Sequence, residues 1–439
     1  MSRLTRIVLS LLLVALMVVG TIAFIFWAIH ASPRFQAILV RIVFVSLLIF
    51  LAILFARYFS LLWFAYLEHA ERNVLEPRKQ VHLPAISVIV PAYNEGAIIE
   101  ETLESLARMD YPAYEVVVVD DGSTDDTLER AVSWQGRHGA GDFRVLTRRN
   151  GGKATALNTG IAASHHPYVF CMDADSRLEA RTLRRAMRMM LEDDSVGAVA
   201  GNVKVANRGK LITKLQALEY IEGLNMPRRA QGFIAAVNIV PGPVGLFRRQ
   251  ALEEMGGYDT DTFAEDADLT LKMVAAGWKV VYEDAAIAWT EAPERWLDLV
   301  QQRYRWTRGI LQSLKKRKGL FLRPFPDFPL WLSVLEMSFE AIVWPILNVY
   351  AQLFFAIVAL LFGAGEMLLY WWILLTLLDL VAAFVTVSME EESLSLVPFA
   401  FAYRFFFILF LDVVKMFAAL DELFNLGMGW EKLRRVATT

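Results

Sequence analysis

The stretch Ile86-Ser87-Val88-Ile89-Val90, followed by the loop Pro91-Ala92-Tyr93-Asn94-Glu95, decides the fold class. A short run rich in β-branched residues predicts a buried strand, and the polar loop then lies at its carboxyl end. A helical stretch runs on to Leu106, and a second apolar run covers Tyr114–Val119. Strands that alternate with helical stretches are typical of crossover connections, so the sequence predicts an α/β domain built on a parallel sheet.

Two further polar loops are expected at the edge of this sheet where ligands bind. The first is Asp120-Asp121-Gly122-Ser123-Thr124-Asp125, whose carboxylates can accept hydrogen bonds from a uracil N–H or from ribose hydroxyls. Turn and capping chemistry explains the residues after Asp121, but not why Asp120 lies beside a buried strand end. The second is Asn150-Gly151-Gly152-Lys153, where glycines allow close backbone approach and lysine offers a point charge for phosphate. Glycine-rich turns before helices are common, so this second loop is a weak signal by itself.

A third apolar run, Tyr168–Met172, ends in Asp173-Ala174-Asp175. Two carboxylates at a strand end suit a hard divalent cation, because Mg²⁺ typically binds one or two carboxylates together with substrate phosphates. Such a cation would neutralise the charge on a leaving nucleotide diphosphate. The motif alone is frequent, but its position after an apolar strand favours a metal site at Asp173 and Asp175.

Two later stretches each have a structural and a functional interpretation. Pro241-Gly242-Pro243-Val244-Gly245 follows a strand-like run and forms either a stiff loop close to a substrate or a plain turn. Asp261–Asp268 precedes a helix predicted over Leu269–Ala276, and acidic residues at a helix N-terminus are stabilised by its dipole. The functional interpretation makes Asp266 a general base that deprotonates an acceptor hydroxyl.

The motif Gln302-x-x-Arg305-Trp306 places three side chains on one helix face. A guanidinium suits a diphosphate, and an indole face suits the apolar side of a sugar ring. The alternative is an amphipathic helix on a membrane surface, with Trp306 as the anchor and Arg303 and Arg308 facing phospholipid.

The 439-residue chain is 56% hydrophobic, and this apolar content is concentrated at the two ends. The net charge of -3 gives no case for a nucleic-acid partner, and the single cysteine, Cys171, excludes a disulfide framework. Membrane spans are predicted in two groups: Ile7–Ile29 and Ala37–Leu67, then Ile342–Phe362, Met367–Val387 and Val397–Leu420.

The chain therefore divides into five parts. These are two transmembrane helices (1–70), a catalytic domain (84–291), amphipathic interfacial helices that carry Gln302 to Trp306 (292–340), about three transmembrane helices (341–425) and a tail (426–439). The basic cluster Lys315–Lys318 places the catalytic domain in the cytoplasm. Five membrane spans place the C-terminus outside the cytoplasm, whereas the basic C-terminal tail favours the cytoplasmic side. We prefer the span count, because residues 330–362 are a short stretch for two membrane crossings.

Several ionisable residues fall within the predicted spans. Arg57 either reaches an interface or faces a polar pathway. Asp379, Arg404, Asp412 and Lys415 either line a sugar path or hold helices together.

In this order, the motifs resemble those of the membrane-integrated processive family-2 glycosyltransferases, which include the synthases of cellulose, chitin, hyaluronan and poly-N-acetylglucosamine. The resemblance covers roughly residues 84–314 and the flanking helices. It implies a GT-A fold inserted between transmembrane helices, a UDP-sugar donor, Mg²⁺ or Mn²⁺, and inversion at the anomeric carbon.

The resemblance also assigns roles to residues of this chain. Asp266 would be the catalytic base, and Asp173 and Asp175 would hold the metal. The donor-binding residues would be Pro91, Tyr93, Glu95, Asp120, Asp121, Lys153, Asp173 and Asp175. The residues at the acceptor and diphosphate would be Gly242, Pro243, Glu265, Gln302, Arg305 and Trp306.

The expected function is processive elongation of a β-linked polysaccharide from a UDP-sugar, with export through the protein's own membrane channel. The layout is most similar to that of the poly-N-acetylglucosamine synthases, so UDP-GlcNAc is the expected donor. The partners would be the donor, the growing polysaccharide and the lipid bilayer, with room for a small membrane accessory subunit. The protein would be a multi-pass protein of the cell membrane.

Two other functions compete with this one. One is a membrane glycosyltransferase that adds one or a few sugars to a lipid or an oligosaccharide. The other is a non-catalytic sensor or scaffold, which gives no reason for the clustered carboxylates Asp173, Asp175 and Asp266.

Overall fold

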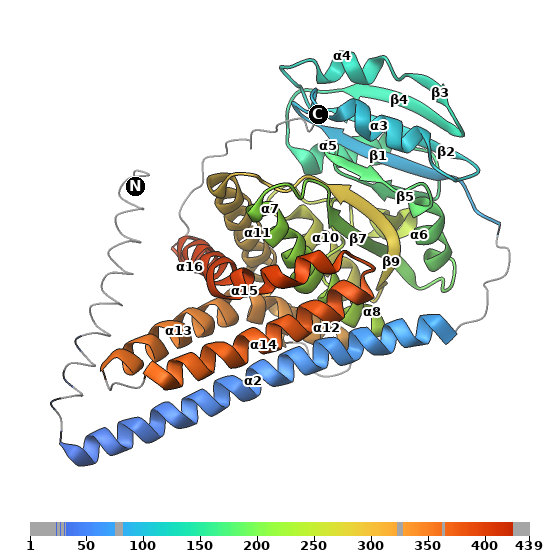
Figure 1. Ribbon diagram of the computed structural model, residues 1–439. Helices are drawn as coiled ribbons and strands as arrows, with labels where there is room; N and C mark the ends of the chain where they lie inside the picture. Colours follow the sequence, from blue (N-terminus) through green and yellow to red (C-terminus); the bar gives the residue numbers. More distant parts are fainter. Residues whose placement is uncertain are drawn as a thin grey trace.

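A computed structural model describes residues 32–74, 82–322, 328–361 and 365–424, together with positions 23, 27 and 30. The expected span Ile7–Ile29, apart from isolated positions, and the tail after residue 424 lie outside the described residues. In Figure 1 the sheet domain forms one end of the molecule, and long helices from both ends of the chain lie beneath it.

A nine-stranded sheet organises the domain, in the order β3-β4-β2-β1-β5-β8-β7-β9-β6. The strands are β1 (Ile86–Ala92), β2 (Tyr114–Asp120), β3 (Gly136–His138), β4 (Gly141–Thr147), β5 (Tyr168–Cys171), β6 (Ser176–Leu178), β7 (Val196–Val205), β8 (Gly245–Arg248) and β9 (Lys279–Thr290). Strands β4, β2, β1 and β5 are parallel, as the sequence predicts, but β8 runs antiparallel to both β5 and β7.

The expectation of a parallel sheet is therefore wrong for this half, and the sheet is mixed. The chain between β7 and β8 is a long helical excursion rather than a single crossover helix. It re-enters the sheet through the loop at Pro241, and Gly245 pairs with Cys171. The strand-like run before Pro241 forms only an isolated bridge, Ala236 with Val280. This return brings the Pro241–Val244 loop to the edge where Asp173 follows β5.

Helices cover both faces of the sheet, because successive strand residues point to opposite faces. Val88 and Val90 pack in one core with α3, α6 and α7, whereas Ile89 packs in a second core with α5, α9 and α10. These helices are α3 (Ile99–Ala107), α4 (Thr127–Val132), α5 (Lys153–Ala163), α6 (Thr182–Met190), α7 (Leu211–Leu218), α8 (Met226–Phe233), α9 (Arg249–Glu254), α10 (Glu265–Ala275) and α11 (Trp296–Lys316).

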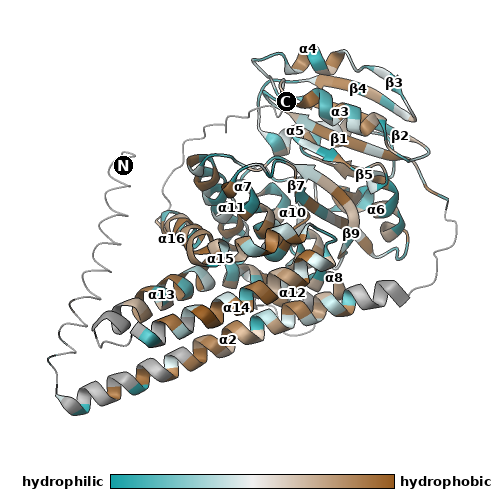
Figure 2. Ribbon diagram, viewed as in Figure 1, coloured by the Kyte–Doolittle hydropathy of each residue, from teal (hydrophilic) through white to brown (hydrophobic). Residues whose placement is uncertain are grey.

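Four described helical stretches are long and apolar enough to cross a membrane, which indicates a membrane protein. They are Leu48–Glu68, Leu330–Ala356, Trp372–Met389 and Leu394–Leu423. Figure 2 shows their apolar colouring along α2, α13 and α14. The helices are α2 (Pro33–Val74), α12 (Phe328–Ser338), α13 (Trp344–Leu361), α14 (Gly365–Met389), α15 (Ala400–Ala402) and α16 (Leu409–Leu423).

Three π-helical segments interrupt the helices where the sheet domain meets the apolar helices. They are η1 (Glu219–Asn225) between α7 and α8, η3 (Phe339–Val343) between α12 and α13, and η5 (Tyr403–Ile408) between α15 and α16. Two short 3₁₀ segments, η2 (Lys318–Leu322) and η4 (Leu394–Phe399), complete the described elements.

Candidate active site

Lys153 joins two carboxylates at the carboxyl edge of the sheet. It is the first residue of α5, and its Nζ lies 2.5 Å from Asp173 Oδ1 and 3.2 Å from Glu265 Oε1. Burial lowers the pKa of Lys153, but Asp173 and Glu265 outweigh this effect and hold that pKa above its usual value. The edge therefore carries a fixed positive charge among acidic side chains.

Asp173 and Asp175 follow β5 as the sequence predicts, and their environment fits a cation. Burial raises the pKa of Asp173, and the ammonium of Lys153 opposes that rise. Asp175 accepts a hydrogen bond from the Ser176 hydroxyl at 3.1 Å. The ammonium beside Asp173 shows that positive charge is stabilised there, and carboxylate oxygens are the ligands that hard divalent cations prefer.

Gly242 lies directly against this pair. A Cβ added at Gly242 would come within 2.6 Å of Lys153 Nζ and 2.8 Å of Asp173 Oδ2. Any side chain would therefore displace the ion pair or the loop that carries Pro243. The loop therefore lies directly against Lys153 and Asp173, and its contact with a substrate stays a prediction.

The carboxylates of Asp120 and Asp121 are buried and hold neighbouring loops. Asp121 accepts hydrogen bonds from the backbone N–H groups of Gly151, at 3.1 Å, and Gly152, at 2.7 Å. Asp120 accepts one from the Thr147 hydroxyl at 3.1 Å. In the described contacts these acids shape the glycine loop that leads into Lys153.

Arg148 completes the anchor of Asp121, with Nη1 2.5 Å from Oδ1. Sequence reasoning missed this residue. The pair Arg148-Arg149 directly before the glycine loop was the available signal.

The first loop is tied to the second by short polar contacts. The Asn94 side-chain oxygen accepts from the Thr124 backbone N–H at 2.7 Å, and the Glu95 N–H donates to the Thr127 hydroxyl at 2.7 Å. Asn94 has a φ of 51°, a left-handed conformation that asparagine tolerates better than most residues. Pro91 is part of β1 itself and is buried, whereas Tyr93 is half-buried in the loop.

Glu265 and Asp266 begin α10, which starts before the predicted Leu269 because acids are favourable in a first turn. Burial raises the pKa of Asp266 to about 6, and the charge of Glu265 adds to the rise. Burial also acts to raise the pKa of Glu265, but Lys153 outweighs it and holds that pKa below its usual value. Neighbouring carboxyls whose pKa values are pushed apart are typical of acid–base sites.

Helix α11 carries Gln302, Arg305 and Trp306 and brings Arg305 toward the same site. The charge of Arg305 contributes to lowering the pKa of Glu265, so its guanidinium lies toward the acidic cluster. All three side chains are half-buried. The tight contact between Gly309 and Ala264 fixes α11 against the residue that precedes Glu265.

The alternative of a surface helix with lipid-facing arginines is wrong. Arg303 is buried, and its Nε and Nη2 donate to the two carboxylate oxygens of Glu219, at 2.8 and 2.6 Å. Its Cζ lies 4.1 Å from the centroid of the Trp306 ring. Arg308 is buried and binds Glu422 of α16 at 2.9 Å. The role of Arg303 was missed, since Glu219 is distant in the sequence.

Comparison with known proteins identifies the family. Residues 84–309, about half of the chain, match the family described as glycosyltransferase like family 2. The chain belongs to this family. The domain described above is thus a glycosyltransferase domain, and it has the mixed α/β architecture of the GT-A fold.

Two curated relatives are poly-beta-1,6-N-acetyl-D-glucosamine synthases. That of Staphylococcus epidermidis is 31% identical over 239 residues, which cover 54% of this chain and 57% of the relative. That of Staphylococcus aureus is 31% identical over 263 residues, which cover 60% and 63%. The similarity spans less than two thirds of these relatives.

A solved structure shows the same fold. The mannosyltransferase PcManGT from Pyrobaculum calidifontis, solved in complex with GDP-Man and Mn²⁺, has a TM-score of 0.61 and 23% identity. The match covers 86% of this chain and 98% of that chain, so the shared fold extends beyond the glycosyltransferase domain.

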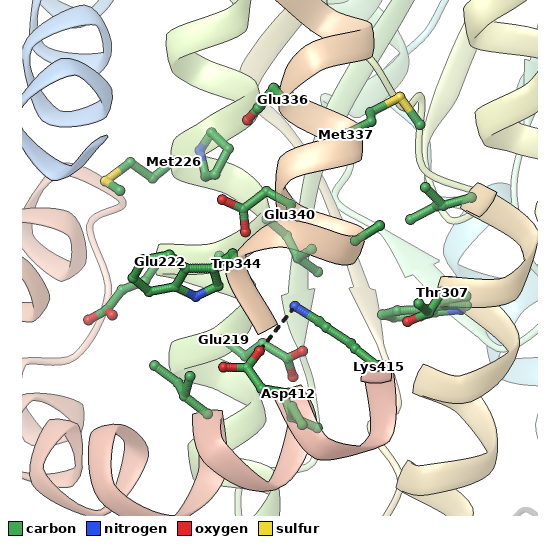
Figure 3. A pocket seen from close by; sticks show the side chains of 18 of the residues that line it. Glu219, Glu222, Met226, Thr307, Glu336, Met337, Glu340, Trp344, Asp412 and Lys415 are labelled. Atoms are coloured by element: carbon green, nitrogen blue, oxygen red, sulfur yellow. Dashed lines mark ion pairs between the residues drawn. The ribbon is translucent and has the colours of Figure 1, made fainter. Parts of the chain in front are cut away.

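A cavity of about 230 Å³ lies between the glycosyltransferase domain and the apolar helices. Trp306 and Thr307 of α11 line one wall, and Arg57 of α2, Glu340 of η3 and Arg404 of η5 line others. Figure 3 shows acidic side chains from several helices converging on this space.

The charges around the cavity are largely paired. Arg57 Nε lies 2.7 Å from Glu340 Oε1, and Lys415 Nζ lies 3.8 Å from Asp412 Oδ1. Arg404 binds Asp379 through two hydrogen bonds. Arg57 and Arg404 therefore pair with acids of other elements, whereas Lys415 pairs within its own helix. All the charged residues noted in the predicted spans except Asp379 also line the cavity.

A second acidic cluster, Asp259, Asp261 and Asp268, lies away from the strand ends. The ammonium of Lys316 already occupies its centre, at 2.5, 2.7 and 3.3 Å from the three carboxylates. Arg317 also binds Asp268, at 2.8 Å. These contacts fasten the end of α11 to α10, so the cluster positions the helix that carries Asp266.

Proposed function

We propose that this protein is an inverting glycosyltransferase that transfers GlcNAc from UDP-GlcNAc to a growing β-linked polysaccharide. The observation that carries the proposal is the grouping of Asp266 with Lys153, Asp173 and Glu265 at the sheet edge. Family membership supports the reaction type, and the names of the curated relatives support the sugar.

The chemistry follows from the charges at this edge. The acceptor hydroxyl attacks the anomeric carbon from the side opposite the diphosphate, so one displacement inverts the configuration. Asp266 accepts the hydroxyl proton, and a pKa near 6 leaves its carboxylate ionised at neutral pH. Lys153 and Arg305 stabilise the charge that develops on the departing diphosphate.

The remaining site residues shape the donor pocket. Asp173 and Asp175 would hold Mg²⁺ or Mn²⁺, which supplies further neutralising charge to the diphosphate when it is bound. Asp120 and Asp121 hold the loop beneath the nucleotide, and Tyr93 and Glu95 lie on the neighbouring loop. Gly242 leaves the backbone close to the sugar, and Pro243 stiffens that loop.

We further propose that elongation is processive and that the cavity beside Trp306 receives the product. Trp306 lines this cavity together with residues from all four apolar helical stretches, which supports such a path. With Lys315–Lys318 on the cytoplasmic side, the domain faces the cytoplasm and the polymer crosses the cell membrane. The alternative, transfer of one or a few sugars to a lipid or oligosaccharide, uses the same chemistry without this path.

UDP release by the purified protein in lipid tests the proposal. UDP-GlcNAc, UDP-glucose and UDP-glucuronate would be compared with Mg²⁺ or Mn²⁺, and the products sized on a gel. High-mass product from UDP-GlcNAc alone is expected. Short or lipid-linked product would favour the alternative, and a requirement for two donors would exclude a homopolymer.

The base assignment has its own control. Asp266→Asn should retain UDP binding and lose transfer, whereas Asp142→Asn, exposed on β4, should leave both unchanged. Transfer that persists in Asp266→Asn would overturn the role of Asp266.

A further inference from the structure

All three π-helical segments of the described chain line one cavity. η1 contributes Glu219 and Glu222, η3 contributes Glu340, and η5 contributes Tyr403 and Arg404. A π-helical turn inserts an extra residue into a helix, and such turns occur frequently at functional sites. Three of them around one space indicate a wall shaped for a ligand rather than for packing alone.

Glu222 differs from the other acids of this cavity. Glu219, Glu340 and Asp412 each have a basic partner, and Glu336 accepts hydrogen bonds from Gln231 and Asn238. Glu222 is 8% exposed, and its Oε1 has no hydrogen-bond partner among the described residues. An unsatisfied buried oxygen costs roughly 1–3 kcal/mol, so Glu222 is an acid whose presence packing alone does not explain.

The chemistry around Glu222 selects an uncharged ligand. Burial, reinforced by the charge of Asp379, raises the pKa of Glu222 to about 8, although Arg404 opposes the rise. At neutral pH the carboxyl is mostly protonated, so it both donates and accepts hydrogen bonds. Met226 and Trp344 offer apolar surface in the same cavity (Figure 3).

The position of Glu222 relates it to the acceptor. It lies one helical turn after Glu219, which holds Arg303 beneath the Trp306 ring. Trp306 and Glu222 both line the cavity. A sugar chain that stacks on Trp306 and continues into the cavity would enter the space that Glu222 also lines.

We propose that the Glu222 carboxyl hydrogen-bonds to the 2-acetamido group of a sugar unit in this cavity, and so selects an N-acetylated polymer. This inference rests on the proposed function. An acetamido group carries a donor and an acceptor without charge, matching the carboxyl, and its methyl group matches the apolar wall.

Binding of oligosaccharides to the full chain in lipid nanodiscs tests the inference. The probes are a short β-1,6-linked N-acetylglucosamine oligosaccharide and the glucose oligosaccharide of the same length, compared by calorimetry. Glu222→Ala should reduce the preference for the N-acetylated probe roughly tenfold, equivalent to about 1.4 kcal/mol. Glu222→Gln, which keeps a donor and an acceptor, should retain part of that preference.

Met337→Leu, a volume-conserving change in the same cavity, is the matched control and should leave the preference unchanged. Glu222→Ala removes an unsatisfied buried oxygen and breaks no hydrogen bond at Oε1, so its thermal unfolding temperature should be no lower than that of the wild type. An unchanged preference in Glu222→Ala, equal weakening for both probes, or no binding of either probe by wild type overturns the inference.

The two experiments distinguish a failure of this inference from a failure of the proposed function. Lost preference in Glu222→Ala together with no UDP release from UDP-GlcNAc would sustain the inference and remove the proposed reaction. UDP release from UDP-GlcNAc together with an unchanged preference in Glu222→Ala would overturn the inference and leave the proposed reaction in place.

Discussion

Gly309 fixes the distance between α11, which carries Arg305 and Trp306, and the start of α10, which carries Asp266. It lies one turn after Arg305 and Trp306 on α11, and it packs on the residue before Glu265. A Cβ at Gly309 would lie 2.5 Å from Ala264 Cβ and 2.8 Å from the Phe263 carbonyl carbon. Ordinary contacts between carbon atoms are about 3.5–4.0 Å, so Gly309→Ala must move the two helices apart by about 1 Å.

This displacement sets the expected effect. Overpacking of this kind costs about 1–3 kcal/mol of folding free energy. A misplacement of about 1 Å between reacting groups can lower the rate about 100-fold, or about 2.7 kcal/mol of barrier. The atoms nearest to a Cβ at Gly309 belong to Ala264 and Phe263, and neither residue is part of the proposed nucleotide loops, so UDP binding should remain within about twofold.

The assay is UDP release at saturating UDP-GlcNAc, together with UDP affinity and thermal unfolding. Gly319→Ala is the matched control, since a Cβ there meets nothing within 4 Å. A Gly309→Ala protein that keeps transfer within about twofold of wild type would refute the claim that α11 and α10 share one rigid contact.

Three more outcomes follow from the site. Asp266 must be ionised to accept a proton. With a pKa of about 6, the rate should fall about tenfold per pH unit below that pH and level off above it. A kcat profile from about pH 5 to 8 checks this expectation, and a flat profile contradicts it. A chelator should abolish transfer, and Mg²⁺ or Mn²⁺ should restore it in wild type but not in Asp173→Asn, as measured by UDP release. Arg303→Leu leaves Glu219 buried without its partner, so it should lower the free energy of unfolding, measured by denaturant titration, by about 3–5 kcal/mol. Adding Glu219→Leu should restore stability. It should not restore elongation, because the Trp306 ring still lacks the support of Arg303.

The parts of the fold that depend on local pattern were predictable from sequence. The strands β1, β2 and β5 follow from short apolar runs that end in polar loops, and the structure confirms the α/β GT-A class. Because the ends of parallel strands meet at one edge, the sequence also predicted that these loops lie together.

The approach of Lys153 to both Asp173 and Glu265 was not predictable, because Glu265 comes from a helix late in the domain. The antiparallel direction of β8 was not predictable either. Its direction depends on the path of a long helical excursion, and no local pattern reports that path.

The wall between the catalytic domain and the membrane helices was hidden from sequence for the same reason. Arg229 is 1% exposed and binds Glu68 of α2 at 3.4 Å, Asp284 of β9 at 2.8 Å and Glu390, just after α14, at 2.9 Å. Each partner belongs to a different element, and only the folded chain brings them together. A buried arginine among such carboxylates cannot lose one partner cheaply. The sheet, α2 and the end of α14 are therefore held as one body, and the position of the cavity relative to Asp266 is fixed by the fold instead of by a flexible linker.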